Sequence, residues 1–348
     1  MARHRIATRA AFATASILTV VAFALGGCSA APVDDTADAQ PVNWDMLVVA
    51  LPNPSAGVTV ANLQQEFADR VNEETDGLVT ITLRTAGEVP YELSELLTTT
   101  GADRLQGGEF GVLQTGESPT IGLFGLPYLI SDVDEFNLAM EALQPFLQAD
   151  YDKYGLVPLY TYAYPPQVVW GKGEAPSSIE DLSGLNIRSS TASQATFLTE
   201  LGAHPTTILP GEVATALDQN LVTALVTAGI NAHALGWDDS LDWGYLSTLG
   251  TFPGILIANR DEFESLPQSV QDTITQIGAE HGPKAIEAII GEEDSVRQDI
   301  ADKGVELIDG KSSDVTNSLK IVVPIWEQWA KDNGVEDALA AVREALDR

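Results

Sequence analysis

Apolar residues in this 348-residue chain alternate between two spacings from Asp45 onward. Residues 46–51 read Met-Leu-Val-Val-Ala-Leu, a short continuous run that is typical of a buried strand. Residues 60–71 then carry apolar side chains at helical spacing, and residues 78–83 return to a strand-like run. Because this alternation repeats along the chain, it indicates an α/β fold with mixed sheets flanked by helices.

The same pattern predicts the remaining elements. Three rings at positions 160, 162 and 164 alternate with smaller residues, so they should share one face of a strand. Gly282-Pro283 should break or kink a long helix. Further helices are predicted at about 91–100, 178–183, 191–201, 211–219, 268–303, 313–332 and 335–346, and further strands at 110–113, 168–170, 185–188 and near 305–308.

Charge and cysteine content exclude several classes of protein. The chain has 18 Lys and Arg against 50 Asp and Glu, a formal net charge of -32, so a nucleic-acid partner is not expected. Its single Cys cannot form a disulfide within the chain or a thiolate metal cluster. With 45% hydrophobic residues, the chain can build a sizeable core, and its length indicates about two domains.

The N-terminus is typical of a secretory signal. The first nine residues carry three Arg and no acid, and an apolar run over 10–25 follows. The run ends in Leu25-Gly26-Gly27-Cys28, which resembles the bacterial lipobox, whose Cys is lipidated after cleavage. We therefore predict a signal peptide at 1–27, followed by a lipidated Cys28 and a flexible tether to residue 43. The alternative is an ordinary signal peptide with an incidental Cys. Cleavage would leave 15 basic and 50 acidic residues, a formal net charge of -35.

Arg188 is the strongest candidate for a ligand-binding group. It ends the predicted strand at 185–188 and directly precedes Ser189-Ser190-Thr191, residue types that cap helix N-termini. In open α/β sheets, ligands bind at the carboxyl ends of strands, where helix N-termini favour anions. A guanidinium in that place can hold a carboxylate through two parallel hydrogen bonds. The alternative is an ordinary ion pair with one of the chain's 50 acids.

A family resemblance supports the binding interpretation. Residues 178–188, which read Ser-Ile-Glu-Asp-Leu-Ser-Gly-Leu-Asn-Ile-Arg, resemble a segment of the DctP-like solute-binding proteins of TRAP (tripartite ATP-independent periplasmic) transporters. Leu-Gly-Ala-His-Pro-Thr at 201–206 and Leu-Phe-Gly-Leu-Pro-Tyr at 123–128 match the same family. The order and spacing of such stretches carry the resemblance from about Asp45 to near the C-terminus.

The resemblance implies a two-lobed fold of the class II periplasmic-binding type, with a hinge and a long C-terminal helix. One lobe should comprise 44–165 plus about 254–294, and the other about 166–253 plus 295–348. It also implies that Arg188 forms a salt bridge with the ligand carboxylate. We expect an extracytoplasmic monomer, held at the periplasmic or outer face of the cell membrane by its lipid alone. It would deliver a small organic acid to the small and large TRAP membrane subunits for ion-gradient-driven uptake.

Two other functions compete with this one. The first is a surface-anchored, hydrolase-like enzyme, although the chain has no Gly-x-Ser-x-Gly elbow, no His-Glu-x-x-His motif and no phosphate-binding Gly loop. The second is a binding protein that feeds a sensor or another transporter. No cofactor is expected, and no metal either, because the His residues lack metal-ligand spacing.

The chain departs from the family pattern around the expected ligand. Many members carry a second Arg where this chain has Gln167, and the usual family Asn is replaced by Thr227, with Asn231 near enough to substitute. Loss of the second cation favours a monocarboxylate, or an acid whose remainder is apolar or sugar-like. Trp237 and Tyr164 are the aromatic candidates for stacking against such a ligand, with core packing as the alternative for each.

Acidic side chains should mostly be solvated surface. This interpretation covers the pair Asp238-Asp239 and the run Glu292-Glu293-Asp294. A net charge of -35 repels an anionic ligand at long range, so capture should depend on local cations, with Arg188 foremost. Affinity that stays level or rises with ionic strength would fit a saline habitat.

Overall fold

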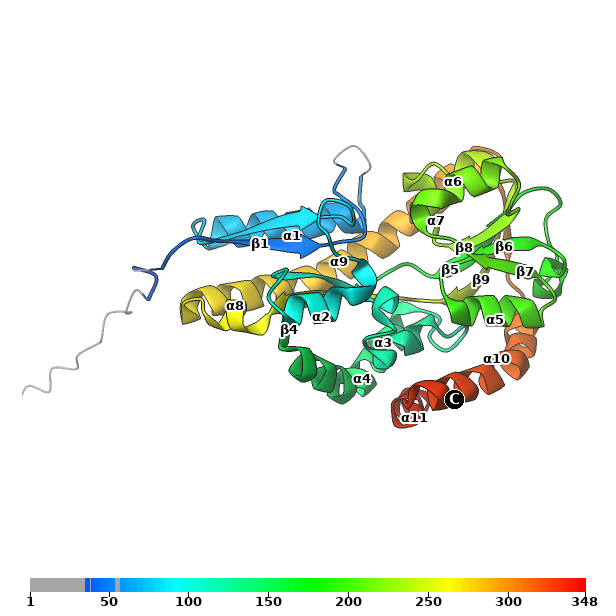
Figure 1. Cartoon of the computed structure of the whole chain (residues 1–348). Coiled ribbons are helices and arrows are strands. Elements are labelled where there is room, and N and C mark those ends of the chain that lie inside the picture. The colour runs from blue at the N-terminus through cyan, green and yellow to red at the C-terminus, as the bar shows by residue number, and fades with distance from the viewer. Residues whose placement is uncertain (1–34, 38, 54–56) are drawn as a thin grey trace, which may run out of the picture. The chain divides into compact units, whose positions relative to one another are not determined.

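Two mixed β-sheets organise the structure, a computed structural model that describes residues 35–37, 39–53 and 57–348 (Figure 1). The first sheet has the order β2-β1-β3-β10-β4 and the second the order β11-β9-β5-β8-β6-β7. The first comprises β1 (Val42–Leu47), β2 (Val79–Arg84), β3 (Gly107–Gly111), β4 (Leu156–Ala163) and β10 (Pro253–Asn259). The second comprises β5 (Gln167–Gly171), β6 (Asn186–Ser189), β7 (His204–Thr207), β8 (Ala224–Thr227), β9 (Trp243–Gly250) and β11 (Glu306–Asp309).

The directions of the strands bring the carboxyl ends of most strands in one sheet toward those of most strands in the other. In the first sheet β1, β2, β3 and β4 run one way and only β10 runs the other. In the second sheet β6, β7, β8, β9 and β11 run together, opposite to β5. Residues 164–166, here called the first crossing segment, lead from the end of β4 to the start of β5. The strands antiparallel to β5 therefore end near the place where β4 ends.

A second crossing segment, residues 251–252, returns the chain from β9 to β10. The two crossing segments are hydrogen-bonded, since the Tyr164 N–H donates to the Phe252 carbonyl at 2.7 Å. Residues 128–130 are hydrogen-bonded to the end of β9 and to the second crossing segment. The Tyr128 N–H donates to the Leu249 carbonyl and the Thr251 N–H donates to the Ile130 carbonyl, each at 3.0 Å. The two sheets thus form the two lobes of a periplasmic-binding fold, joined by paired segments.

Helices flank both sheets. Around the first sheet lie α1 (Val60–Glu74), α2 (Leu96–Gly101), α3 (Pro119–Gly122), α4 (Val133–Tyr154) and α8 (Arg260–Glu264). With the second sheet lie α5 (Ala192–Glu200), α6 (Pro210–Asp218) and α7 (Gly229–Ala234). The C-terminal part forms α9 (Gln268–Asp302), α10 (Ser312–Asn333) and α11 (Glu336–Ala345). Single 3-10 turns occur at Leu93–Glu95, Val112–Gln114, Leu123–Gly125, Ile179–Leu182 and Asp238–Ser240.

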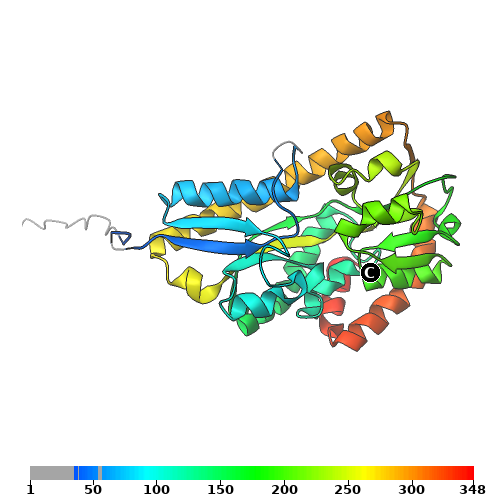
Figure 2. The same ribbon diagram turned by 45° about the horizontal axis from the view of Figure 1, so that its top comes forward.

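The long helix α9 packs against elements of both lobes. It contacts α1 and β4 beside the first sheet and α7 beside the second (Figure 2). The expected break at Gly282-Pro283 does not occur, because α9 continues through Pro283 as one helix. Loss of a single backbone donor is tolerated here, since the apolar face of α9, including Ile277, Ala285 and Ile289, is buried against the first sheet.

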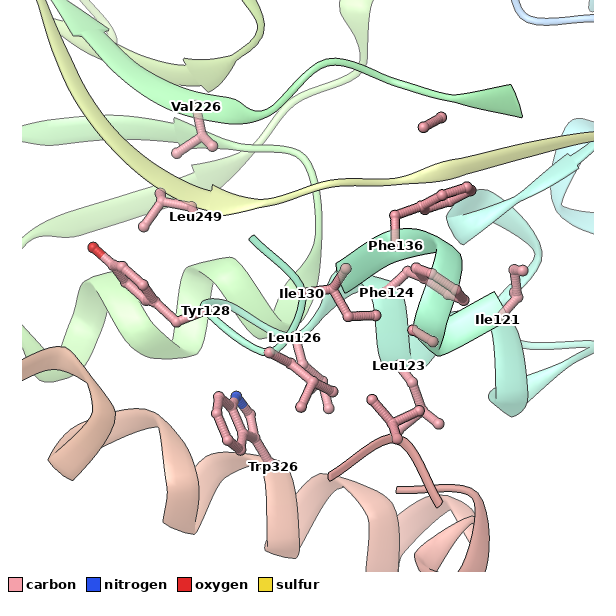
Figure 3. Packing of buried hydrophobic residues seen from close by; sticks show 14 of the residues in the cluster. Ile121, Leu123, Phe124, Leu126, Tyr128, Ile130, Phe136, Val226, Leu249 and Trp326 are labelled. Atoms are coloured by element: carbon pink, nitrogen blue, oxygen red, sulfur yellow. The ribbon is translucent and has the colours of Figure 1, made fainter. Parts of the chain in front are cut away.

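One hydrophobic cluster contains buried residues from both lobes. It joins Phe124 and Phe136 near the first sheet to Val226 and Leu249 of the second, and Trp326 of α10 closes it from below (Figure 3). The Trp326 indole N–H donates to the Pro127 carbonyl at 2.8 Å, which satisfies the buried donor. α10 packs on α5 and α11 packs on α4, so the C-terminal helices cover this cluster.

Several elements differ from the sequence-based expectation. β3 begins at Gly107, ahead of the predicted strand at 110–113, and ends at Gly111, where the Gln114 side chain accepts a hydrogen bond from the Gly111 N–H at 2.7 Å. The glycines that begin β3 carry no apolar signal, yet a Cβ at Gly107 would lie 2.2 Å from the Ile257 carbonyl oxygen. The elements that were not predicted above are α3, α4, α7, α8, β7, β8, β9 and β10.

No helix in the part of the chain that the structure describes is long and apolar enough to cross a membrane. The predicted signal peptide and Cys28 lie outside the described residues.

Candidate ligand-binding site

Arg188 lies at the carboxyl edge of β6, where the second sheet faces the first. Its side chain is 5% exposed. Nε donates to the Ile208 carbonyl at 2.9 Å, and Nη1 donates to the Val226 carbonyl and to Ser190 Oγ, both at 3.0 Å. Because these acceptors belong to β8 and to the loops after β6 and β7, three neighbouring segments hold the guanidinium in one orientation.

No acid in the described part of the chain neutralises the charge of Arg188. Within the described residues it forms no ion pair with an acid, so the alternative of an ordinary ion pair is not observed. Its Nη2 has no hydrogen-bond partner among these residues and is not sealed from solvent. Burial lowers the pKa of Arg188 to about 10, which still leaves the group cationic at neutral pH. A buried cation with one free donor nitrogen is suited to receive an anion.

Two further predicted residues reach the same edge with unused polar atoms. Thr227 ends β8 beside Val226, and Gln167 begins β5, whose next residue pairs with Thr227. Both are 3% exposed. Thr227 Oγ1 and Gln167 Oε1 have no partner among the described residues, yet neither atom is fully sealed. Buried side chains whose polar tips remain reachable are typical of a small-molecule site.

Asn231 lies in the first turn of α7, directly after β8. It is half-buried, and within the described chain no hydrogen bond joins its side chain, or that of Gln167, to Arg188. The structure therefore places Thr227 directly after Val226, whose carbonyl accepts from Arg188, and places Asn231 four residues further along, in α7.

Trp237 is buried, at 3% exposure, rather than displayed on a loop. It precedes the turn Asp238–Ser240, and its ring lies 5.9 Å from Arg188 Cζ, a cation-π contact. The same ring belongs to the hydrophobic cluster beneath β8, with Leu225 and Ile300. Trp237 thus both packs in the core and forms one wall beside the guanidinium.

The solvated-surface interpretation is wrong for Asp238, which is 2% exposed. Its carboxylate accepts hydrogen bonds from Lys303 Nζ at 2.7 Å and from His233 Nδ1 at 2.8 Å. Burial alone would raise the pKa of Asp238, but these two hydrogen bonds hold it below its usual value. Asp238 therefore ties the turn that carries Trp237 to the end of α9.

The solvated-surface interpretation is also wrong for Glu293 of α9, which is 1% exposed. Its two oxygens accept the N–H groups of Gly229 and Ile230, at 2.8 and 2.7 Å, and Arg297 Nε donates to it at 2.7 Å. A carboxylate at this place compensates the free N–H groups and the positive end of α7. Hydrogen bonds to Glu293 and Asp238 thus fix both ends of residues 229–238, the segment that contains Asn231 and Trp237.

Tyr164 lies on the first crossing segment, and its hydroxyl is hydrogen-bonded to the first sheet and not to Arg188. Its hydroxyl donates to Glu109 Oε1 of β3 at 2.5 Å, as the Tyr162 hydroxyl does at 2.6 Å. Burial and the charge of Glu109 raise the pKa of Tyr164 well above its usual value, so it stays a donor. Sequence reasoning missed Glu109, although a lone acid inside the strand Gly-Gly-Glu-Phe-Gly was a usable signal.

An open pocket of about 340 Å³ adjoins the first crossing segment and is not lined by Arg188. It is lined by Pro166, the N-terminus of α4 and the stretch of α9 around Glu293. Within the described residues, no three His, Cys, Asp or Glu side chains are grouped so as to hold a metal ion.

Two mixed sheets with facing carboxyl edges, joined by paired crossing segments, define a two-lobed α/β binding protein. At the edge of one lobe lies a buried Arg that has no acidic partner among the residues described. The chain belongs to the bacterial extracellular solute-binding proteins of family 7, whose model matches residues 53–332. This confirms the resemblance to TRAP solute-binding proteins.

Individual relatives are distant in sequence but similar in fold. A solute-binding protein of Sulfitobacter sp. (strain NAS-14.1) is 25% identical over 288 residues, which are 80% of this chain and 85% of the relative. The crystal structure of DctP7, a Bordetella pertussis extracytoplasmic solute receptor binding pyroglutamic acid, matches with a TM-score of 0.78 at 22% identity, covering 88% of this chain and 100% of that one. A TRAP periplasmic solute-binding protein from Sulfitobacter sp. NAS-14.1 with bound β-D-galacturonate matches with a TM-score of 0.76 at 17% identity, covering 87% and 100%.

Proposed function

We propose that this protein binds a small organic acid between its two lobes and delivers it to the membrane subunits of a TRAP transporter for ion-gradient-driven uptake. The family assignment supports this role, and the similar structures hold pyroglutamate and galacturonate, both of them carboxylates. Delivery would involve one small and one large integral membrane subunit, with Cys28 anchoring the receptor by its lipid.

The observation that carries the proposal is the state of Arg188. A buried guanidinium without a carboxylate partner is costly unless an anion completes it, and its free Nη2 provides the place for one. Thr227 Oγ1 lies on the adjacent strand end as a second donor to the same ligand carboxylate. Trp237 beside the guanidinium would exclude water and strengthen the ion pair.

The chemistry around Arg188 favours a ligand with one carboxylate. Gln167 stands where many family members carry a second cation, and it offers an amide oxygen and an amide N–H instead. The ligand would therefore be a monocarboxylate, or an acid whose remainder is apolar or sugar-like.

The test is a thermal-shift screen of the protein without residues 1–27 against pyroglutamate, galacturonate, succinate and neutral galactose. A ligand at 100 times its dissociation constant should add about 2.7 kcal/mol to the free energy of unfolding. Arg188→Gln should weaken binding of a carboxylate at least about 30-fold, because loss of one partner of a buried charged pair costs about 2 kcal/mol or more. Arg260→Gln is the matched control, since this Arg pairs with Asp152 beside the first sheet.

Three results would count against the proposal. If Arg188→Gln left the shift from a carboxylate unchanged while both variants stayed folded, Arg188 would not be the ligand anchor. Binding of galactose alone would exclude an anion site. Steady chemical turnover of a bound acid would favour the surface-anchored enzyme, while a gene neighbourhood without two TRAP membrane subunits would favour a sensor or another transporter.

A further inference from the structure

Tyr128 has a strained backbone at a point where the two lobes meet. Its φ angle is +60°, in the left-handed region that a residue with a large side chain rarely adopts. The other non-glycine residues with positive φ in the described chain are all Asp or Asn, which tolerate this region. Such strain persists only where the surrounding structure holds it, and it is concentrated at positions that bind or move.

The side chain and the N–H of Tyr128 are bonded to the second lobe. The hydroxyl shares a hydrogen bond with Ser247 Oγ of β9 at 2.9 Å, and the ring packs edge-on against Phe197 of α5, with centroids 5.6 Å apart. The N–H donates to the carbonyl of Leu249, also in β9 (Figure 3). The residues that follow lead into α4, which packs on β4 of the first sheet. The chain therefore turns at Tyr128 from the second lobe toward the first.

Arg348, which follows α11, holds this turn. Its Nη1 donates to the Tyr128 carbonyl at 3.0 Å and to the Leu129 carbonyl at 2.6 Å. Its Nη2 pairs with Glu135 in the first turn of α4. Because one guanidinium bonds to two successive carbonyls, it fixes the orientation of the two peptide groups that follow the strained residue. Arg348 thus ties residues 128–130, here called the strap, to the start of α4.

The other end of the strap reaches the candidate ligand-binding site. The Ile130 carbonyl accepts the N–H of Thr251, in the second crossing segment, at 3.0 Å. The residue before it, Gly250, ends β9 and pairs with Gln167 at the start of β5. A displacement of the strap would therefore displace the end of β9 and the second crossing segment beside Gln167.

The polar atoms of the candidate site remain reachable in this arrangement of the lobes. Arg188 Nη2, Thr227 Oγ1 and Gln167 Oε1 lack partners among the described residues and are not fully sealed. To bury a ligand between them, the lobes have to close by bending at the crossing segments. The strap is bonded to β9 on one side and, through Arg348, to α4 on the other, so closure has to deform it.

We propose that Arg348 is a positioning residue that clamps the strap in this ligand-accessible arrangement, and that closure of the lobes releases the strain at Tyr128. The two effects oppose each other, because the hydrogen bonds of Arg348 hold the accessible arrangement while the left-handed backbone disfavours it. The affinity for every ligand then depends on Arg348, although its side chain bonds only to the strap and to Glu135 among the described residues. The inference goes beyond the proposed function and rests on it only for the affinity measurement.

The first test is the affinity of Arg348→Gln in the protein without residues 1–27. Every acid that binds in the thermal-shift screen should bind about three- to tenfold more tightly, because loss of the clamp raises the population of the closed arrangement. The ratio of affinities between two acids should not change. The ligand-free variant should nevertheless melt at a lower temperature, since hydrogen bonds of a charged group are lost. A merely structural role would lower the melting temperature without raising the affinity.

Arg70→Gln is the matched control. The side chains of Arg70 and Arg348 are 30% and 26% exposed, and both form ion pairs. The partners of Arg70 are Glu74 of α1 and Glu280 of α9, far along the chain from the strap. This variant removes the same charge, so it shows whether net charge alone alters the affinity. We expect the affinity of Arg70→Gln to match that of the unmodified protein.

The second test measures the lobes directly and needs no ligand. Spin labels are placed on Glu73→Cys in α1 and Gln219→Cys at the end of α6, both exposed positions, in protein that also carries Cys28→Ser. In the ligand-free state, Arg348→Gln should add a second distance between the labels to the distribution of the unmodified protein. Where an acid binds, its complex should show the same second distance. Circular dichroism establishes that each variant is folded.

Several results would overturn the clamp. Unchanged or weaker affinity in folded Arg348→Gln contradicts it, and so does a tighter affinity confined to one acid, which would mean a direct contact with that ligand. A distance distribution identical to that of the unmodified protein contradicts it as well. If no acid binds the unmodified protein, the proposed function fails, and the distance distribution of the ligand-free protein still decides the role of Arg348.

Discussion

At the scale of single residues, burial decides the chemistry of side chains whose type alone says little. His281 of α9 is 5% exposed and packs against the rings of Phe67 and Tyr160, with centroid distances of 5.7 and 4.9 Å. Its Nε2 is buried and has no hydrogen-bond partner among the described residues. Burial, together with the positive charges of Arg70 and Lys284, lowers the pKa of His281 to about 4.

This pKa predicts a pH-dependent stability. Between about pH 6.5 and pH 4 the unfolded chain binds a proton on His281 that the folded protein excludes, so the free energy of unfolding should fall as the pH is lowered through that range. The loss attributable to His281 should approach about 3 kcal/mol at the acid end. Urea unfolding from pH 7.5 to 4 of the unmodified protein and of His281→Leu measures it. Parallel pH profiles for the two proteins would show that His281 does not contribute.

At the scale of elements, α9 is positioned by small residues that let it approach β4. A Cβ at Gly278 would lie 1.9 Å from the Leu159 carbonyl oxygen, and one at Gly282 would lie 2.7 Å from the Thr161 carbonyl oxygen. Backbone cannot yield as a flexible side chain can, so these two glycines set the distance between helix and sheet. The same helix carries Glu293 to the N-terminus of α7, which links its packing to the candidate ligand-binding site.

Two Gly→Ala substitutions in α9 should therefore have opposite effects. Gly278→Ala should destabilise the protein by about 1–3 kcal/mol or more, because the methyl group forces the helix away from β4. Gly291→Ala, where nothing lies within 4 Å of the new Cβ, should stabilise it by about 0.5–1 kcal/mol through helix propensity. Chemical denaturation of both variants checks the signs. Equal effects would contradict the close approach of α9 and β4.

At the scale of the whole molecule, a large negative net charge contrasts with the cation proposed to bind the ligand. The predicted mature chain has a formal net charge of -35, yet Arg188 is buried and unpaired in the described structure. Salt shortens the range of charge interactions from about 10 Å at 0.1 M to about 3 Å at 1 M. It therefore screens the long-range repulsion of an anionic ligand more than the buried contact with Arg188.

The affinity for a bound carboxylate should consequently stay level or rise between 0.1 and 1 M NaCl. Calorimetric titration of the acid that binds most tightly in the thermal-shift screen measures this dependence. The titrations are done at several salt concentrations, at neutral pH, in a buffer whose pH does not change with salt. A steep fall in affinity with salt would mean that solvent-exposed cations, and not the buried Arg188, hold the ligand.

Much of the fold was predictable because its elements carry local signals. Helical spacing and an apolar run place α1 and β2 correctly, and Thr191 caps α5 as its hydroxyl and position predict, accepting from the Gln194 N–H at 3.2 Å. The strand predicted at 46–51 is displaced, because β1 spans Val42–Leu47 and the apolar residues after it lie outside the strand. β3 was displaced because its glycines are selected by contact with neighbouring strands, which no local pattern records. The lobe boundaries stay predictions, as do the ligand-binding roles of the residues around Arg188.

By itself the sequence determined the alternating α/β elements, the family and the candidacy of Arg188, because these depend on residue type and on spacing along the chain. Only the tertiary structure decided which charges are paired. Among the described residues, it showed Arg188 without an acid and Glu109 without a cation. It also showed Asp238 and Glu293 buried and hydrogen-bonded to α7. The physical reason is that the state of a charge depends on partners and solvent access, which distant segments such as β3, β6 and α9 provide only when the chain is folded.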